Sequence, residues 1–191
     1  RVKELYMFKK ILGVLVSAFL IPLAFSTMAK ADSIYMQVTD IKGESKVKAY
    51  DGWIELNGFN FSISKSSPVP GATRTSGKAT FNDIKIQKYM DLSSTALMSS
   101  AATGKQIKTI VIDVVRDTGE DDYVVTKYTL SDVLISSFTQ SHSAGDEAET
   151  GVEEIGLNYA KITVDYSAVL ANGKAGAKTK FGWDVPANRA L

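Results

Sequence analysis

The sequence predicts a mainly β fold, in which antiparallel sheets form a β-barrel-like packed pair with one short α-helix at the side. Two observations favour this fold class. The chain holds eight Tyr and eight Phe among many Val, Ile and Thr, residue types that suit strands. Beyond residue 31 the apolar residues recur with a period of two rather than 3.6. With 191 residues, 45% of them apolar, the chain is long enough for one domain that buries a core.

Residues 1–31 form an N-terminal extension, in which residues 7–31 have the pattern of a secretory signal peptide. The basic pair Lys9-Lys10 precedes the apolar run Ile11–Phe25, and Ala29-Lys30-Ala31 follows as a small-x-small cleavage site. The apolar run is short for a membrane span and is interrupted by polar and helix-breaking residues. We therefore expect a cleaved leader and no stable membrane span in the mature form.

The first two strands are expected between residues 34 and 63. Alternation places Ile34, Met36 and Val38 on one face of the first strand. In the second, the parity of the apolar residues breaks at Asn57-Gly58, which predicts a β-bulge and a curved sheet. Its inward residues are expected to be Ile54, Leu56, Phe59, Phe61 and Ile63. The opposite face then carries the small polar residues Asn60, Ser62 and Ser64.

A loop and then a helix are expected next. Ser66–Gly77 contains two prolines and almost no apolar residues, so it is predicted to be a long exposed loop. Asp91–Thr103 is the one convincing helix, capped by Asp91 or Ser93 and stopped by Gly104. Its apolar residues close to one face are Leu92, Ala96, Leu97 and Ala101.

The rest of the chain has the pattern of strands. Ile110, Ile112 and Val114 alternate, and Thr118-Gly119-Glu120-Asp121-Asp122 has the composition of a hairpin turn. A similar alternation surrounds Leu130 and continues through Ile162, Val164 and Tyr166.

Charge and composition exclude several function classes. Lys and Arg (22) nearly balance Asp and Glu (21), and no basic cluster is interleaved with aromatic residues, so we expect no nucleic-acid partner. The absence of Cys excludes disulfides, thiolate metal sites and Cys nucleophiles. No phosphate-loop motif and no calcium-loop register is present, and no cofactor is expected.

The sequence offers no candidate catalytic residue. His142, the single histidine, lies in a polar segment without a nucleophile elbow and is expected to be a solvated loop residue. Two acidic clusters are best interpreted as solvated turns and loops. Their members are Asp117, Glu120, Asp121 and Asp122, and then Asp146, Glu147, Glu149, Glu153 and Glu154. We therefore expect a protein that is not an enzyme.

An ordered series of motifs runs through residues 33–191. It begins with Tyr35–Ser45, which ends in Gly43-Glu44-Ser45, and continues with Phe81–Asp91, Ala101–Lys105 and Leu130–Ser137. It ends with Leu157–Tyr166 and Gly182-Trp183-Asp184. In this order and spacing the chain resembles the hemolysin-coregulated protein (Hcp) family, the inner-tube subunit of type VI secretion systems.

The resemblance implies a homohexameric ring that stacks with further rings into a hollow tube. It implies that the tube is closed by a spike protein, driven outward by a contractile sheath and able to carry effector proteins into the extracellular space. A sheet would line the channel, where Asn60, Ser62 and Ser64 are suitable wall residues. The long loop would contact the neighbouring ring through Pro68, Val69, Pro70, Gly71, Ala72, Thr73 and Arg74.

The leader and the resemblance favour different routes out of the cell. Cleavage after Ala31 leaves Asp32–Leu191 as the mature domain, exported through the periplasm. Tube proteins of the family start near the first strand, so a start at Met28 instead of Met7 implies a cytoplasmic protein before type VI secretion. An alternative to the tube subunit is therefore an exported β-sandwich that binds or adheres to a ligand and keeps only the fold.

Overall fold

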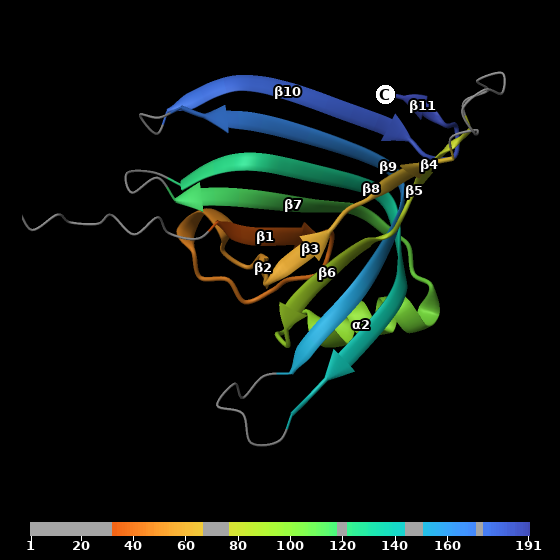
Figure 1. Cartoon of the computed structure of the whole chain (residues 1–191). Helices are drawn as coiled ribbons and strands as arrows, with labels where there is room; N and C mark the ends of the chain where they lie inside the picture. The colour runs from red at the N-terminus through yellow and green to blue at the C-terminus, as the bar shows by residue number, and fades with distance from the viewer. Residues whose placement is uncertain (1–31, 67–76, 118–121, 144–150, 171–173) are drawn as a thin grey trace, which may run out of the picture.

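In a computed structural model of the chain, the structure describes residues 32–66, 77–117, 122–143, 151–170 and 174–191. The described residues form eleven strands, one α-helix and one 3₁₀ helix, and confirm a mainly β fold with antiparallel pairing throughout (Figure 1). The helices are η1 (Lys48–Tyr50) and α2 (Ser94–Thr103). The strands are β1 (Ser33–Val38), β2 (Ile54–Leu56), β3 (Gly58–Asn60), β4 (Ile63–Lys65), β5 (Ala79–Phe81), β6 (Ile84–Tyr89), β7 (Ile107–Asp117), β8 (Asp122–Ser141), β9 (Val152–Val169), β10 (Ala175–Asp184) and β11 (Arg189–Ala190).

The strands do not close into a barrel, so that part of the predicted fold class is wrong. Nine of them form one sheet in the order β11-β10-β9-β8-β7-β1-β2, while β6 joins the other half of β9 and β3 joins β6. The remaining two, β4 and β5, form a separate ribbon. The two long strands β8 and β9 bend and belong to both halves of the sheet (Figure 1). In the part of the chain that the structure describes, one edge of β10 is unpaired along most of its length.

The bend in β8 and β9 is visible in the burial pattern. Within β8 the inward residues change from Leu130 to Val133, a step of three instead of two, and Asp132 between them has φ 56°. Within β9 the same step of three separates Tyr159 from Ile162. In β8 this residue in the left-handed region breaks the extended alternation. In both strands the extra step lets the two halves present apolar side chains to one core.

The core lies between the halves of the bent sheet and beneath α2. Leu97 of the helix is fully buried, and Ala101 packs against the core. Gly104 ends the helix at φ 65° and donates its backbone N–H to the Ser100 carbonyl, which confirms the predicted stop. The fully buried strand residues of the core are Met36, Ile54, Ile84, Ile86, Ile110, Ile112, Leu130, Val133, Ile155, Leu157 and Ile162.

The helix starts three residues later than predicted. A turn precedes it, in which the Asp91 carboxylate accepts the Ser93 backbone N–H at 2.9 Å, and the Asp91 N–H donates to Ser94 Oγ at 3.0 Å. Leu92 belongs to this turn and is 72% exposed, so its predicted position on the inner face is wrong. Short polar side chains such as those of Asp and Ser form hydrogen bonds with backbone groups in turns as readily as at helix caps. The turn therefore takes residues that the sequence assigned to the helix, and the helix starts later.

The predicted second strand is three short strands with different partners. β2 pairs with β1, β3 pairs with β6, and β4 pairs with β5. The parity break at Asn57 is therefore the point where the chain passes from one half of the sheet to the other, and not a bulge within one pairing. The Asn57 N–H completes the crossing by donating to the Gln87 carbonyl at 2.8 Å.

The predicted hairpin between β7 and β8 is confirmed, because Asp117 pairs with Asp122. Residues 118–121 of its turn lie outside the described part.

The Gly43-Glu44-Ser45 motif joins three parts of the fold. A Cβ on Gly43 would collide with the backbone of Trp53 and lie 2.7 Å from the Ile54 Cα, so only glycine fits. The Gly43 and Ser45 N–H groups donate to the carbonyls of Gly52 and Trp53 at 2.8 and 3.0 Å. Glu44 accepts the Leu92 N–H at 2.9 Å, which ties the segment to the start of the helix. The motif is therefore explained by packing.

Candidate functional site

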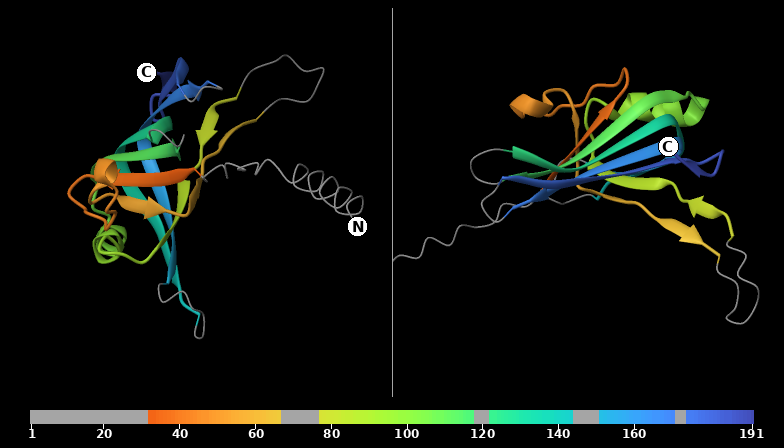
Figure 2. Two further views of the ribbon diagram at one scale, coloured as in Figure 1. Left: turned by 90° about the vertical axis from the view of Figure 1, so that its left-hand side faces the viewer. Right: turned by 90° about the horizontal axis from the view of Figure 1, so that it is seen from above.

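The predicted wall residues Asn60 and Ser62 are exposed, and Phe59 and Phe61 pack against the core, as the alternation requires. Ile63 does not follow the predicted alternation, because its side chain is 45% exposed. Ser64 is also exposed, but it pairs with Thr80 in the β4–β5 ribbon and not with the sheet of Asn60. Figure 2 shows this ribbon leaving the body on the side away from α2. The three residues are thus exposed, but Asn60 belongs to β3 of the main sheet, Ser64 belongs to the separate ribbon, and Ser62 lies between these strands.

The face that carries Asn60 extends over four strands. Asn60 pairs with Lys85, Lys85 pairs with Gly156, and Gly156 pairs with Ser137. Lys85 donates to Ser137 Oγ at 3.0 Å and lies 3.9 Å from the carboxylate of Glu154. Both charged side chains are about half exposed, at 45% and 49%. The face is therefore polar and charged, whereas the sequence suggested a wall without charge.

The open edge of β10 carries a second candidate surface. Phe181 (39% exposed) and the partly buried Trp183 lie on one face of this strand, with ring centroids 6.3 Å apart and nearly parallel. Phe81 of β5 stacks on both, at 6.4 and 5.7 Å. Tyr166 and Ile63 add further exposed apolar area, at 45% each. An apolar surface beside an unpaired strand edge is suited to association with another protein chain.

A buried ion network lies where β6, β9 and α2 meet. Lys88 and Glu153 are both fully buried and form an ion pair at 2.8 Å. Lys88 also contacts Asp91 at 2.9 Å and donates to Ser94 Oγ at 3.1 Å. The Ser94 hydroxyl donates to Glu153 at 2.9 Å, and the Gln140 amide donates to the second carboxylate oxygen at 3.1 Å. The prediction that Glu153 belongs to a solvated acidic loop is therefore wrong.

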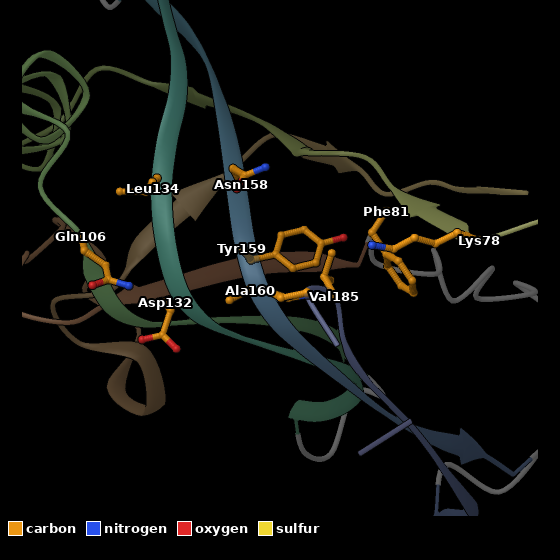
Figure 3. A pocket seen from close by; sticks show the side chains of 10 residues that line it. Lys78, Phe81, Gln106, Asp132, Leu134, Asn158, Tyr159, Ala160 and Val185 are labelled. Carbon is orange, nitrogen blue, oxygen red and sulfur yellow. The ribbon is translucent and has the colours of Figure 1, made fainter. Parts of the chain in front are cut away.

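A hollow of about 350 Å³ opens beside the bend of β8 and β9 (Figure 3). The ring of Tyr159 points toward Val185 and Phe81, and its hydroxyl donates to the Asn82 carbonyl at 3.2 Å. Burial raises the pKa of Tyr159, and the nearby carboxylate of Asp83 raises it further, so this hydroxyl stays neutral at physiological pH. The residues that line the hollow do not place a nucleophile beside a base, so its geometry supports no catalytic step.

Other residues and features that the sequence singled out can be compared with the structure in turn. His142 is exposed at the end of β8. The loop residues from Pro68 to Arg74 lie outside the described residues, and so does the leader. Within the described part, no three His, Asp or Glu side chains are grouped to hold a metal ion. No helix in that same part is long and apolar enough to cross a membrane.

Residues 35–166 match the family model described as "Type VI secretion system effector, Hcp". The chain is 31% identical over 160 residues to Hcp1 of Pseudomonas aeruginosa, an alignment that covers 83% of this chain and 98% of that protein. This chain belongs to the Hcp family. Hcp proteins form a family of type VI secretion tube proteins that are secreted by that system, and not a family of enzymes.

Solved structures agree with the assignment to Hcp. A structure of a type six secretion system protein superimposes with a TM-score of 0.79 at 27% identity, covering 84% of this chain and all of that chain. Hcp1 from Salmonella typhimurium superimposes with a TM-score of 0.69 at 22% identity, covering 85% and 100%, and supports the fold. Both of these solved chains are matched over their full length.

Proposed function

We propose that this Hcp protein is the structural subunit of a type VI secretion tube, in which hexameric rings stack into a hollow channel that carries effectors. The match to nearly the whole of an Hcp1 protein carries this proposal. The tube would act by geometry, with a spike at its tip, a contractile sheath around it and cargo inside. No cofactor is part of this mechanism.

The edge of β10 supports ring closure. Among the described residues, its outer side has no strand partner except where β11 pairs with Trp183 and Asp184. An open strand edge next to exposed Phe181 and Tyr166 would be covered if the sheet continued into a neighbouring subunit. Six such contacts would close a ring without leaving an edge exposed.

We expect the 32–191 domain to form a ring of about six subunits in solution. Multi-angle light scattering at micromolar concentration measures the mass directly. A monomer mass would contradict the tube function. It would favour the exported binding or adhesion module instead, for which the leader pattern of residues 7–31 is the supporting observation.

Asn60→Arg is expected to block cargo passage while leaving the fold intact. Asn60 is exposed, so the substitution itself should change the free energy of unfolding by less than about 0.5 kcal/mol. The new charge would stand beside Lys85 and would repeat in every subunit, so like charges would crowd the channel. Effector export measures the loss, and thermal unfolding measures the fold.

Two matched variants test the placement of Asn60. Asn60→Gln keeps the side chain polar and neutral, so export should continue. Phe61→Arg puts a charge on the side of the strand that packs against the core and should unfold the domain. If Phe61→Arg folds normally while Asn60→Arg does not, the assignment of the two faces is reversed.

The loop between β4 and β5 is expected to act in ring stacking rather than ring closure. Replacing Val69–Thr75 with a short Gly-Ser link should leave single rings of unchanged mass and abolish tubes. Electron microscopy of concentrated protein shows tubes, and light scattering shows the rings. Loss of the rings themselves would refute this division of roles.

A further inference from the structure

The hollow beside the bend of β8 and β9 has apolar walls that are not all covered. Leu134 of β8 lines it and is 42% exposed, and the ring of Tyr159 and the side chain of Val185 form further parts of the wall (Figure 3). Its volume of about 350 Å³ lies near the lower end of the usual range for ligand sites, about 300–1,000 Å³. The hollow is therefore the size of a site for one long side chain or a short segment.

The charged groups of the hollow lie at opposite ends. In Figure 3, Asp132 and Gln106 lie at one end of the lining and Lys78 lies at the other. Asp132 is exposed, and it forms no ion pair with a Lys or Arg of the described residues. An ionised carboxylate only accepts hydrogen bonds, and the neighbouring amide adds another acceptor oxygen. This end is therefore suited to a ligand group that carries a positive charge and several N–H donors.

A second carboxylate makes the hollow more negative. Asp83 accepts hydrogen bonds from the Asn158 amide at 2.8 Å and from the Ser136 hydroxyl, both of which are neutral donors. In the part that the structure describes, no Lys or Arg forms an ion pair with it. Burial raises the pKa of Tyr159 and the Asp83 carboxylate raises it further, so the negative charge of Asp83 reaches a side chain that lines the hollow. Lys78 offsets only one of the two carboxylates.

The hollow continues the face that carries Asn60. Leu134 pairs with Asn158 across β8 and β9. Leu134 lies two residues from Ser136, and Asn158 lies two residues from Gly156, which belongs to the Asn60 row. Residues two apart on a strand point to the same side. If this face lines the channel of the tube, the hollow opens into the channel.

We propose that the hollow binds the side chain of an arginine on a cargo protein. Arginine combines an apolar stem with a planar fork of N–H donors that a carboxylate can bind through two hydrogen bonds. The fork would lie at Asp132 and Gln106, while the stem would cover Leu134 and lie along the ring of Tyr159. Lys78, at the opposite end, would donate to a backbone carbonyl of the same segment. The inference rests on the proposed tube function, which provides the cargo.

The test compares two dye-labelled glycine peptides, one with a central arginine and one with citrulline in its place. Citrulline has nearly the same shape but no charge. We expect the full chain to bind the arginine peptide at least about tenfold more tightly, because hydrogen bonds between two charged groups are the stronger ones. Fluorescence anisotropy measures both affinities. The preference should decrease at about 1 M salt, since the carboxylates are accessible to solvent. Light scattering under the same conditions gives the ring mass.

Two matched variants locate the site. Asp132→Asn removes the charge, and Asn tolerates the φ of 56° at this position, so the bend should remain. This variant should bind the two peptides with affinities that differ by less than about twofold. Asp165→Asn is the control, because this carboxylate of β9 is also partly exposed, at 45%, but pairs with Lys180 outside the hollow. It should keep the full preference for arginine.

Three results would overturn the inference. Equal affinities of the parent chain for the two peptides would show that no arginine site exists. A preference that persists in Asp132→Asn would place the site elsewhere. A preference shown by the monomer and lost in the ring would show that a neighbouring subunit covers the hollow. A monomer mass with the preference intact would contradict the tube function but support the arginine site, so the two failures are distinct.

Discussion

Replacing Lys88 with methionine is expected to lower the free energy of unfolding by about 3–5 kcal/mol, the usual effect of breaking a buried ion pair. Lys88 is fully buried and contacts Glu153 at 2.8 Å and Asp91 at 2.9 Å. Methionine fills a similar volume but leaves the buried carboxylate of Glu153 without its counter-charge. Urea denaturation of the 32–191 domain, followed by circular dichroism at fixed protein concentration, measures the loss.

Two further variants separate loss of the pair from loss of the lysine stem. Lys85→Met removes a lysine from the same strand whose side chain is 45% exposed, so it should change stability by less than about 0.5 kcal/mol. The double change Lys88→Met with Glu153→Leu removes both charges and should recover much of the loss. If the double variant is less stable than Lys88→Met alone, the unpaired carboxylate is not the cause.

Gly43→Ala is expected to destabilise the domain by about 3 kcal/mol or more, because the added methyl group meets rigid backbone. The new Cβ would collide with the Trp53 carbonyl and lie 2.7 Å from the Ile54 Cα, and β2 starts at Ile54. The clash can be relieved only if the Gly43–Ser45 segment moves away from Trp53 and Ile54. Such a movement would break its hydrogen bonds to Gly52, Trp53 and Leu92. Thermal unfolding measures the effect.

Gly58→Ala is the matched control for this prediction. Gly58 also lies in the N-terminal part of the sheet, but nothing is found within 4 Å of an added Cβ. Alanine there removes backbone freedom from the unfolded chain without a clash, so stability should change by less than about 1 kcal/mol. Equal losses at both positions would show that close approach of Trp53 does not explain the glycine at position 43.

Local features were predictable from the residues next to them. The exposed Asn60 and buried Met36 follow from alternation, because successive side chains of a strand point to opposite faces. Gly104 ends the helix because glycine adopts φ 65° without a steric penalty. The hairpin between β7 and β8 follows from a short turn sequence. Each of these depends on only a few neighbouring residues.

The sequence patterns do not predict features that join distant parts of the chain. Glu153 was assigned to a solvated loop because acidic residues surround it in the sequence, yet it pairs with Lys88, 65 residues away, in the core. The charged neighbours of Asn60, Lys85 and Glu154, come from two other strands. The parity break at Asn57 was interpreted as a bulge because the alternation does not show that β2 and β3 have different partners.

The sequence by itself determined the β class, the helix and its end, the inward and outward faces of most strands, and membership of the Hcp family through ordered motifs. Only the tertiary structure decided that the sheet stays open at β10, that β8 and β9 bend to enclose one core, and that Lys88 and Glu153 meet inside it. The physical reason is that side-chain direction along a strand is local, with a period of two. The choice of neighbouring strands is made by the packing of the whole chain.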